Sequence, residues 1–144
     1  LLRPMIEIKS FVFSPFSENT YVLYDETREA ILIDPGCYEV HEYQEINGFI
    51  QDNQLTPVGI YNTHAHIDHV LGVEKLKNKY GIPFALHRLD EPLLRAVKSY
   101  APNYGFPTFS EPEVERWLKE GEAVEFGNSS LNILFERFSI FSFN

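Results

Sequence analysis

The feature that most constrains this chain is a dense group of metal-ligand side chains directly after an apolar run. Three histidines and one aspartate, His64, His66, Asp68 and His69, follow the apolar residues 57–61. Neutral imidazole and carboxylate groups are the usual protein ligands of zinc and of similar divalent ions. The whole chain has 5 histidines, so packing or solubility poorly explains why most of them gather here. The motif therefore predicts a metal site at the end of a buried strand.

The spacing of the motif divides its four ligands into two pairs. Side chains two residues apart on an extended segment point the same way, so His64 and His66 are expected to bind one metal together. Asp68 has the character of a helix N-cap residue, with His69 in the first helical turn. Asp68 and His69 are then expected to face a second metal. In a site with one metal, one of them would act instead as a base or as an orienting group.

Hydrophobic periodicity predicts an α/β chain. Alternating residues at 6–13, 20–24 and 29–33 predict three antiparallel strands, and a further strand is expected at 57–62. Helical spacing predicts helices at 38–52, 68–80 and 89–99, and Gly81 is a suitable left-handed cap for the second. A short strand is expected at 82–86, and 122–126 and 130–135 are expected to form a hairpin that turns at Gly127 and Asn128. Trp117, at helical spacing from Val114, is expected in the core.

Composition limits the classes of function. The formal net charge of −9 disfavours nucleic-acid binding, because phosphate backbones are held mainly by lysine and arginine. The single cysteine, Cys37, cannot form an internal disulfide, which fits a reducing compartment. The sequence has no apolar run of about 18 residues and no basic-then-apolar leader, so we expect no membrane association and a cytoplasmic location.

Three segments together resemble one known family. The His-x-His-x-Asp-His motif after a hydrophobic strand is similar to the signature of the metallo-β-lactamase superfamily. Residues 30–36 resemble the family's strand that ends in Asp-Pro-Gly, and residues 16–23 resemble its early strand that contains an asparagine. The resemblance extends over roughly residues 6–135 in the family's order. The metal motif is specific, whereas the two strand patterns gain weight only from that order.

The resemblance implies a fold, a chemistry and a set of site residues. The fold would be the N-terminal half of an αββα sandwich, with a mixed, mainly antiparallel sheet and flanking helices. The chemistry would be metal-dependent hydrolysis of a small-molecule thioester of the hydroxyacylglutathione type, or of a related ester or lactone. One or two zinc ions held by His64, His66, Asp68 and His69 would activate water, and Asp68 would also accept a proton from it. Asp34 would support the metal loop and orient the ligating imidazoles.

The chain departs from the family in its later part. The family's second half supplies a further histidine to the first metal, a bridging aspartate and a last histidine, but no histidine follows His87 here. We therefore expect residues 1–144 to be a single, incomplete domain, in which the origin of residues 136–144 is open. A second hypothesis is a mononuclear iron persulfide dioxygenase. A third is a non-catalytic half-domain that binds metal weakly or assembles with another copy as a homodimer, through an exposed sheet edge and an uncovered apolar face.

Other conspicuous residues have ordinary interpretations. His41 is expected on the surface of a helix, and His87 has no ligand counterpart in the family. Cys37 is expected to be a loop thiol without a catalytic role, since no histidine partner is evident. The aromatic loop 100–107 is either a substrate lip or a cover for core surface.

Overall fold

Strands and helices of the chain form two sheets and a helical layer. The computed structural model describes residues 5–13, 15–136 and 139–143. Its strands are β1 (Glu7–Phe13), β2 (Glu18–Tyr24), β3 (Glu29–Ile33), β4 (Thr56–Tyr61), β5 (Phe84–His87), β6 (Arg116–Leu118), β7 (Ala123–Phe126), β8 (Ser129–Glu136) and β9 (Ser139–Phe143). Its helices are α1 (Val40–Asp52), α2 (Ile67–Val70), α3 (Val73–Tyr80) and α4 (Glu91–Tyr100), with 3-10 turns η1 (Arg88–Asp90) and η2 (Ala101–Tyr104).

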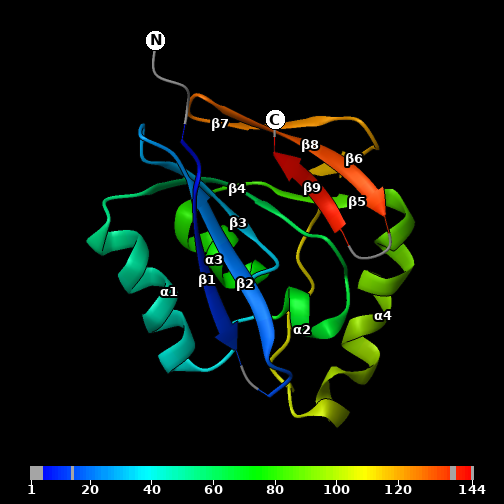
Figure 1. Ribbon diagram of the computed structural model, residues 1–144. Helices are drawn as coiled ribbons and strands as arrows, with labels where there is room; N and C mark the ends of the chain where they lie inside the picture. The colour runs from blue at the N-terminus through cyan, green and yellow to red at the C-terminus, as the bar shows by residue number, and fades with distance from the viewer. Residues whose placement is uncertain (1–4, 14, 137–138, 144) are drawn as a thin grey trace.

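The larger sheet has six strands in the order β1-β2-β3-β4-β5-β6. Strands β1, β2 and β3 are antiparallel neighbours, whereas β3 to β6 pair in parallel. The smaller sheet, β7-β8-β9, is antiparallel throughout. Figure 1 shows the smaller sheet lying across the larger sheet, and the helices α1, α3 and α4 lying beside the larger sheet. The predicted α/β class with a mixed sheet and flanking helices is confirmed.

Period-two alternation sends the strand side chains into two separate cores. Val22, Leu32 and Ile60 pack with residues of α1, α3 and α4 such as Ile46 and Leu76. The intervening positions face the smaller sheet, in a cluster of Leu23, Ile31, Ile33, Tyr61, Ala85, Leu118, Val124, Phe126 and Leu131. Because successive strand side chains point to opposite faces, one run of apolar residues fills both cores. This arrangement buries β3 and β4, whose carboxyl ends carry Asp34 and the histidine motif.

Asp25 fastens the smaller sheet to the end of β2. Its Oδ2 atom accepts hydrogen bonds from the Asn128 backbone N–H at 2.8 Å and from the Ser129 hydroxyl at 2.6 Å. Burial alone would raise the pKa of Asp25, but hydrogen bonds from Ser129, Thr27 and Asn128 lower it below its usual value. The predicted hairpin with its turn at Gly127 and Asn128 is confirmed, and the carboxylate explains how it is anchored.

The single helix predicted over 68–80 is wrong. The segment instead forms α2 and α3, with Leu71 and Gly72 between them, and His66 rather than Asp68 stands at the N-cap of α2. The Gly72 N–H donates to the Pro35 carbonyl at 2.8 Å, and a Cβ at Gly72 would collide with the Cys37 sulfur. The loop after β3 therefore packs directly against Gly72, and this contact interrupts the helix.

Two further predictions are refined in detail. Trp117, expected in the core, lies on β6 and is half-buried against the helical core, with the Arg88 guanidinium 4.1 Å from its ring centroid. The helix predicted at 89–99 begins as η1 and continues as α4, with Pro92 in the first turn of α4, where its missing N–H costs nothing. Strand β9 has no counterpart in the predictions, and residues 137, 138 and 144 lie outside the described part of the chain.

No helix within the described residues is long and apolar enough to cross a bilayer.

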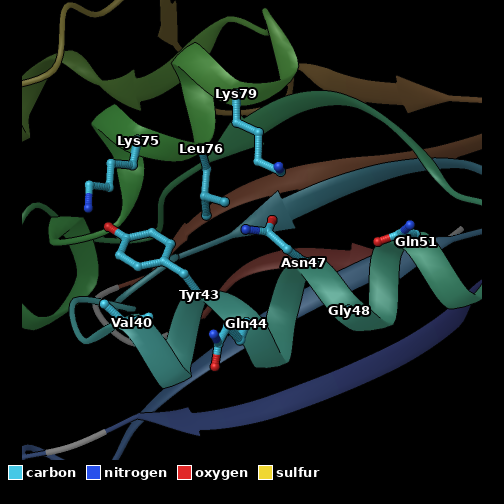
Figure 2. A pocket seen from close by; sticks show the side chains of 9 residues that line it. All are labelled: Val40, Tyr43, Gln44, Asn47, Gly48, Gln51, Lys75, Leu76 and Lys79. Atoms are coloured by element: carbon cyan, nitrogen blue, oxygen red, sulfur yellow. The ribbon is translucent and has the colours of Figure 1, made fainter.

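A groove of about 520 Å³ lies between α1 and α3 (Figure 2). The described residues that line it include amide side chains, Tyr43, Leu76 and the two lysines Lys75 and Lys79, but no histidine or carboxylate. Its chemistry does not match a metal site, so its size alone does not make it the functional centre.

Candidate metal centre

The predicted site residues gather at one edge of the larger sheet. Asp34 follows β3, and His64 lies three residues after the end of β4. Because β3 and β4 are parallel, their carboxyl ends meet at the same edge. Strand β2 runs antiparallel to β3, so the start of β2, with Glu18, lies at the same edge as the end of β3. Three strands thus bring carboxylates and imidazoles to one place.

Asp34 connects the loop after β3 to the histidine motif. Its Oδ1 atom accepts a 2.6 Å hydrogen bond from the Thr63 N–H, and its Oδ2 atom accepts one from the Thr63 hydroxyl. The Asp34 backbone has a φ of 52°, a left-handed conformation that is uncommon outside glycine and asparagine. Gly36 then permits a close approach, because a Cβ there would collide with the Asp68 carbonyl and the Glu18 carboxylate. The Asp-Pro-Gly sequence therefore turns the chain tightly under the motif.

Asn62 and Thr63 shape the turn that carries the histidines. The Asn62 side-chain amide donates to the carbonyls of His64 at 3.2 Å and of His69 at 2.7 Å, which closes the motif into a loop. The Thr63 hydroxyl also lies 2.8 Å from His64 Nδ1. Since that hydroxyl donates to Asp34, the contact is best satisfied by a proton on His64 Nδ1, which leaves Nε2 as the nitrogen available to a metal.

The three imidazoles of the motif lie close together. The ring centroids of His64 and His66 are 5.5 Å apart in a stacked arrangement, and those of His64 and His69 are 5.1 Å apart. His66 and His69 are 6.5 Å apart, and His66 is the exposed member. The turn thus brings together the residues that the sequence predicted as ligands.

His69 faces carboxylates with both of its ring nitrogens. Its Nδ1 atom lies 3.1 Å from Asp34 Oδ2 and 3.6 Å from Glu18 Oε1, while its Nε2 atom lies 3.6 Å from Asp68 Oδ2. Burial alone would lower the pKa of His69, but contact with Asp34 and the charges of Asp34, Asp68 and Glu18 raise it. A nitrogen so surrounded by carboxylate oxygen attracts a proton or a cation.

The donor set fits a divalent ion. Ligand atoms of Asp34, His64 and His69 lie within 4.8 Å of one another. Imidazole nitrogen with carboxylate oxygen suits zinc and iron. This group includes Asp34 and omits His66 and Asp68, so the division of roles between ligands and supporting residues stays a prediction. The contacts of Asp34 with Thr63 and His69 are those expected of a supporting residue.

Glu18 is a part of this site that the sequence analysis missed. Its side chain is buried, and burial raises its pKa to about 8 despite the hydrogen bond from Thr20 and the charge of His69. The Thr20 hydroxyl lies 2.8 Å from Glu18 Oε2 and 2.8 Å from the Asp34 carbonyl, and it accepts a 3.0 Å hydrogen bond from the Gly36 N–H. A glutamate at the start of a strand looks like a surface residue, so only its neighbours across the sheet reveal its place.

A cavity of about 330 Å³ opens onto the site. His64, Asp68 and His69 line it, together with Glu18, Asp34 and the aromatic rings of Phe16 and Tyr21. The Phe16 ring lies 6.4 Å from Tyr104 and 6.0 Å from Phe106, both in the aromatic loop 100–107. Phe106 is buried and Tyr104 is exposed, so this loop both covers core surface and borders the wall of the cavity.

The remaining histidines and the cysteine lie apart from this group. His41 is exposed on α1, and His87 caps η1 by accepting a 3.0 Å hydrogen bond from the Leu89 N–H. Cys37 is fully buried, and burial strongly raises its pKa, which disfavours a nucleophilic thiolate. These placements agree with the ordinary interpretations of all three residues.

Curated relatives share the sequence over most of this chain. An uncharacterised protein of Aquifex aeolicus is 35% identical over 130 residues, which are 88% of this chain and 58% of that protein. The hydroxyacylglutathione hydrolase GloC of Haemophilus influenzae is 25% identical over 131 residues, which are 90% of this chain and 60% of that protein. The chain therefore spans less than two thirds of the length of these relatives.

Solved structures are also similar to this chain. The BLEG-1 B3 metallo-beta-lactamase superposes with a TM-score of 0.74 at 26% identity, over 89% of this chain and 60% of that one. The protein TTHA1623, solved in a di-iron-bound form, gives a TM-score of 0.71 at 31% identity, over 88% of this chain and 59% of that one. The model of the metallo-beta-lactamase superfamily matches residues 14–134. This match, which includes both the buried strands and the histidine motif, shows that the chain belongs to the metallo-beta-lactamase superfamily.

Proposed function

We propose that this protein is a metal-dependent hydrolase that cleaves small-molecule thioesters of the hydroxyacylglutathione type, or related esters and lactones. The observation that carries the proposal is that His64, Asp68 and His69 line one cavity near the carboxyl ends of β3 and β4, with the His66 ring stacked 5.5 Å from that of His64. The name of the Haemophilus influenzae relative supports the thioester as the substrate class.

In this proposal His64 and His66 hold one ion, and Asp68 with His69 holds a second ion or completes a single centre. Asp34 and Thr63 fix the rings of His64 and His69 from behind, so that their Nε2 atoms are presented to the cavity. A zinc or iron ion held by these residues would supply polarisation of a scissile carbonyl and activation of water. Asp68 Oδ2, half-exposed and 3.6 Å from His69 Nε2, is placed to accept a proton from the attacking water.

The test is a hydrolysis assay of the metal-loaded protein against a hydroxyacyl thioester, a lactone and a phosphoester. We expect thioester cleavage that falls by at least 100-fold in Asp68→Ala, since general-base groups contribute about 100- to 10,000-fold. Glu120→Ala, a change at an exposed residue of the same chain, serves as the control. Absence of turnover on all three substrates, or full activity in Asp68→Ala, would contradict the proposal.

Iron is the alternative metal, because the similar protein TTHA1623 was solved in a di-iron-bound form. Imidazole and carboxylate ligands accept iron as readily as zinc, so the donor set does not choose between them. Iron would open the dioxygenase hypothesis, in which a persulfide is oxidised. Oxygen consumption that depends on a persulfide substrate, without thioester cleavage, would replace the hydrolase proposal.

A further inference from the structure

We propose that Glu18 is a positioning residue of the metal centre, which holds the Nδ1 side of the His69 imidazole so that Nε2 is offered to the metal. The inference rests on the proposed metal centre and assigns a role to a residue outside the histidine motif. Glu18 touches neither substrate nor metal in this proposal and acts only through His69.

A buried oxygen of Glu18 faces the His69 ring. Glu18 Oε1 has no hydrogen-bond partner among the described residues and lies 3.6 Å from His69 Nδ1. Asp34 Oδ2 lies 3.1 Å from the same nitrogen, so Glu18 Oε1 is the atom left without a partner. Buried polar atoms in folded proteins are almost always paired, and leaving one unpaired costs about 1–3 kcal/mol. A shift of a few tenths of an ångström would join Glu18 Oε1 and His69 Nδ1 in a hydrogen bond.

The rest of the Glu18 carboxyl group is already held in place. Its Oε2 atom is fixed by Thr20, and the absence of a side chain at Gly36 leaves room for it against the neighbouring loop. Only Oε1 is left to interact, and it points at His69. The Glu18 side chain is only 2% exposed.

His69 needs support on this side for a geometric reason. Its ring has carboxylates at both nitrogens, with Asp34 and Glu18 at Nδ1 and Asp68 at Nε2. Asp34 Oδ2 also accepts a hydrogen bond from the Thr63 hydroxyl, so this oxygen is shared between Thr63 and His69. A second acceptor at Nδ1 fixes the proton there and leaves Nε2 as the free nitrogen beside Asp68. Residues behind metal-ligating histidines act in this way and are worth about 10- to 100-fold in metal affinity.

The first experiment uses nitrogen-15 NMR of the histidine side chains in the native 144-residue chain. We expect a slowly exchanging proton on His69 Nδ1, and we expect added zinc to perturb His69 Nε2 while the Nδ1 proton remains. An Nδ1 that exchanges freely, or a zinc ion bound through Nδ1, would overturn the proposal. The Nδ1 signal is read without metal and without turnover, so a protein with this signal but no hydrolysis would refute the proposed function alone.

The second experiment compares Glu18→Met with Glu18→Gln. Methionine keeps the length of the side chain but removes both oxygen acceptors, whereas glutamine keeps one carbonyl acceptor and replaces the other oxygen by an amide NH2. We expect zinc affinity, measured by chelator competition, to fall about 10- to 100-fold in Glu18→Met and to stay near the native value in Glu18→Gln. The slowly exchanging Nδ1 proton should be lost only in Glu18→Met.

Asp25→Asn is the matched control, because Asp25 is another buried carboxylate directly after the opposite end of β2. It should lower the melting temperature and leave zinc affinity unchanged. Equal affinity losses in Glu18→Met and Glu18→Gln would show that the retained carbonyl acceptor does not hold His69, which would contradict positioning. Native affinity in both variants would contradict it as well.

Discussion

Asp34 accepts a 2.6 Å hydrogen bond from the backbone N–H of Thr63, a residue 29 positions further along the chain. This hydrogen bond joins the loop after β3 to the loop after β4, which carries the histidines. The carboxylate also contacts the Thr63 hydroxyl and His69 Nδ1. One side chain thereby determines the position of two predicted ligands.

Replacing Asp34 by asparagine should weaken the metal centre. The amide group has one acceptor oxygen where the carboxylate has two, so either the Thr63 N–H loses its acceptor, or the Thr63 hydroxyl and His69 Nδ1 lose their shared one. We expect metal affinity to fall about 10- to 100-fold, as measured by chelator competition. Asp52→Asn, at the exposed end of α1, should leave affinity unchanged, and equal affinities in the two variants would refute the supporting role of Asp34.

Alanine at Gly72 and at Gly48 should have opposite effects. A Cβ at Gly72 would collide with the Cys37 sulfur and crowd the carbonyls of the loop after β3, and overpacking of this kind costs about 1–3 kcal/mol. Gly48 lies within α1 with open space around its α-carbon, so alanine there should stabilise by about 0.5–1 kcal/mol. Denaturant unfolding measures both. A neutral Gly72→Ala would show that the break between α2 and α3 does not depend on this contact.

The Asp25 anchor predicts a loss of stability in acid. Its pKa is lowered in the folded chain, so its stabilising effect is fully present above the unfolded value of about 4 and is lost as pH falls through the folded value. Asp25→Asn should therefore destabilise the protein by about 1–3 kcal/mol at pH 7 and by much less at strongly acidic pH. Urea unfolding at both pH values tests this. An equal difference at the two pH values would mean that the carboxylate charge is not what anchors the hairpin.

Cys37 should resist thiol reagents in the native protein. It is fully buried, and its raised pKa keeps it protonated at pH 8. Labelling by a disulfide reagent should therefore proceed at the rate of local or global opening and become fast in denaturant. Rapid labelling without denaturant would contradict this placement.

The sequence predicted the parts of this fold that depend on local pattern. Alternation located the strands, and the histidine spacing placed His64, His66, Asp68 and His69 in a turn after β4. The interruption at Gly72 was not predictable, because it comes from the loop near Pro35 and Cys37 pressing on a helix that is regular in local sequence. The burial of Glu18 likewise depends on packing between β2 and the segment after β3.

The most direct test of the account is elemental analysis of the purified chain beside a His64→Ala/His66→Ala double variant. The account predicts zinc or iron in stoichiometric amount in the native chain and its loss in the variant. Equal metal content in the two proteins, or no metal in either after loading with zinc and iron, would contradict the claim that these histidines form a metal centre.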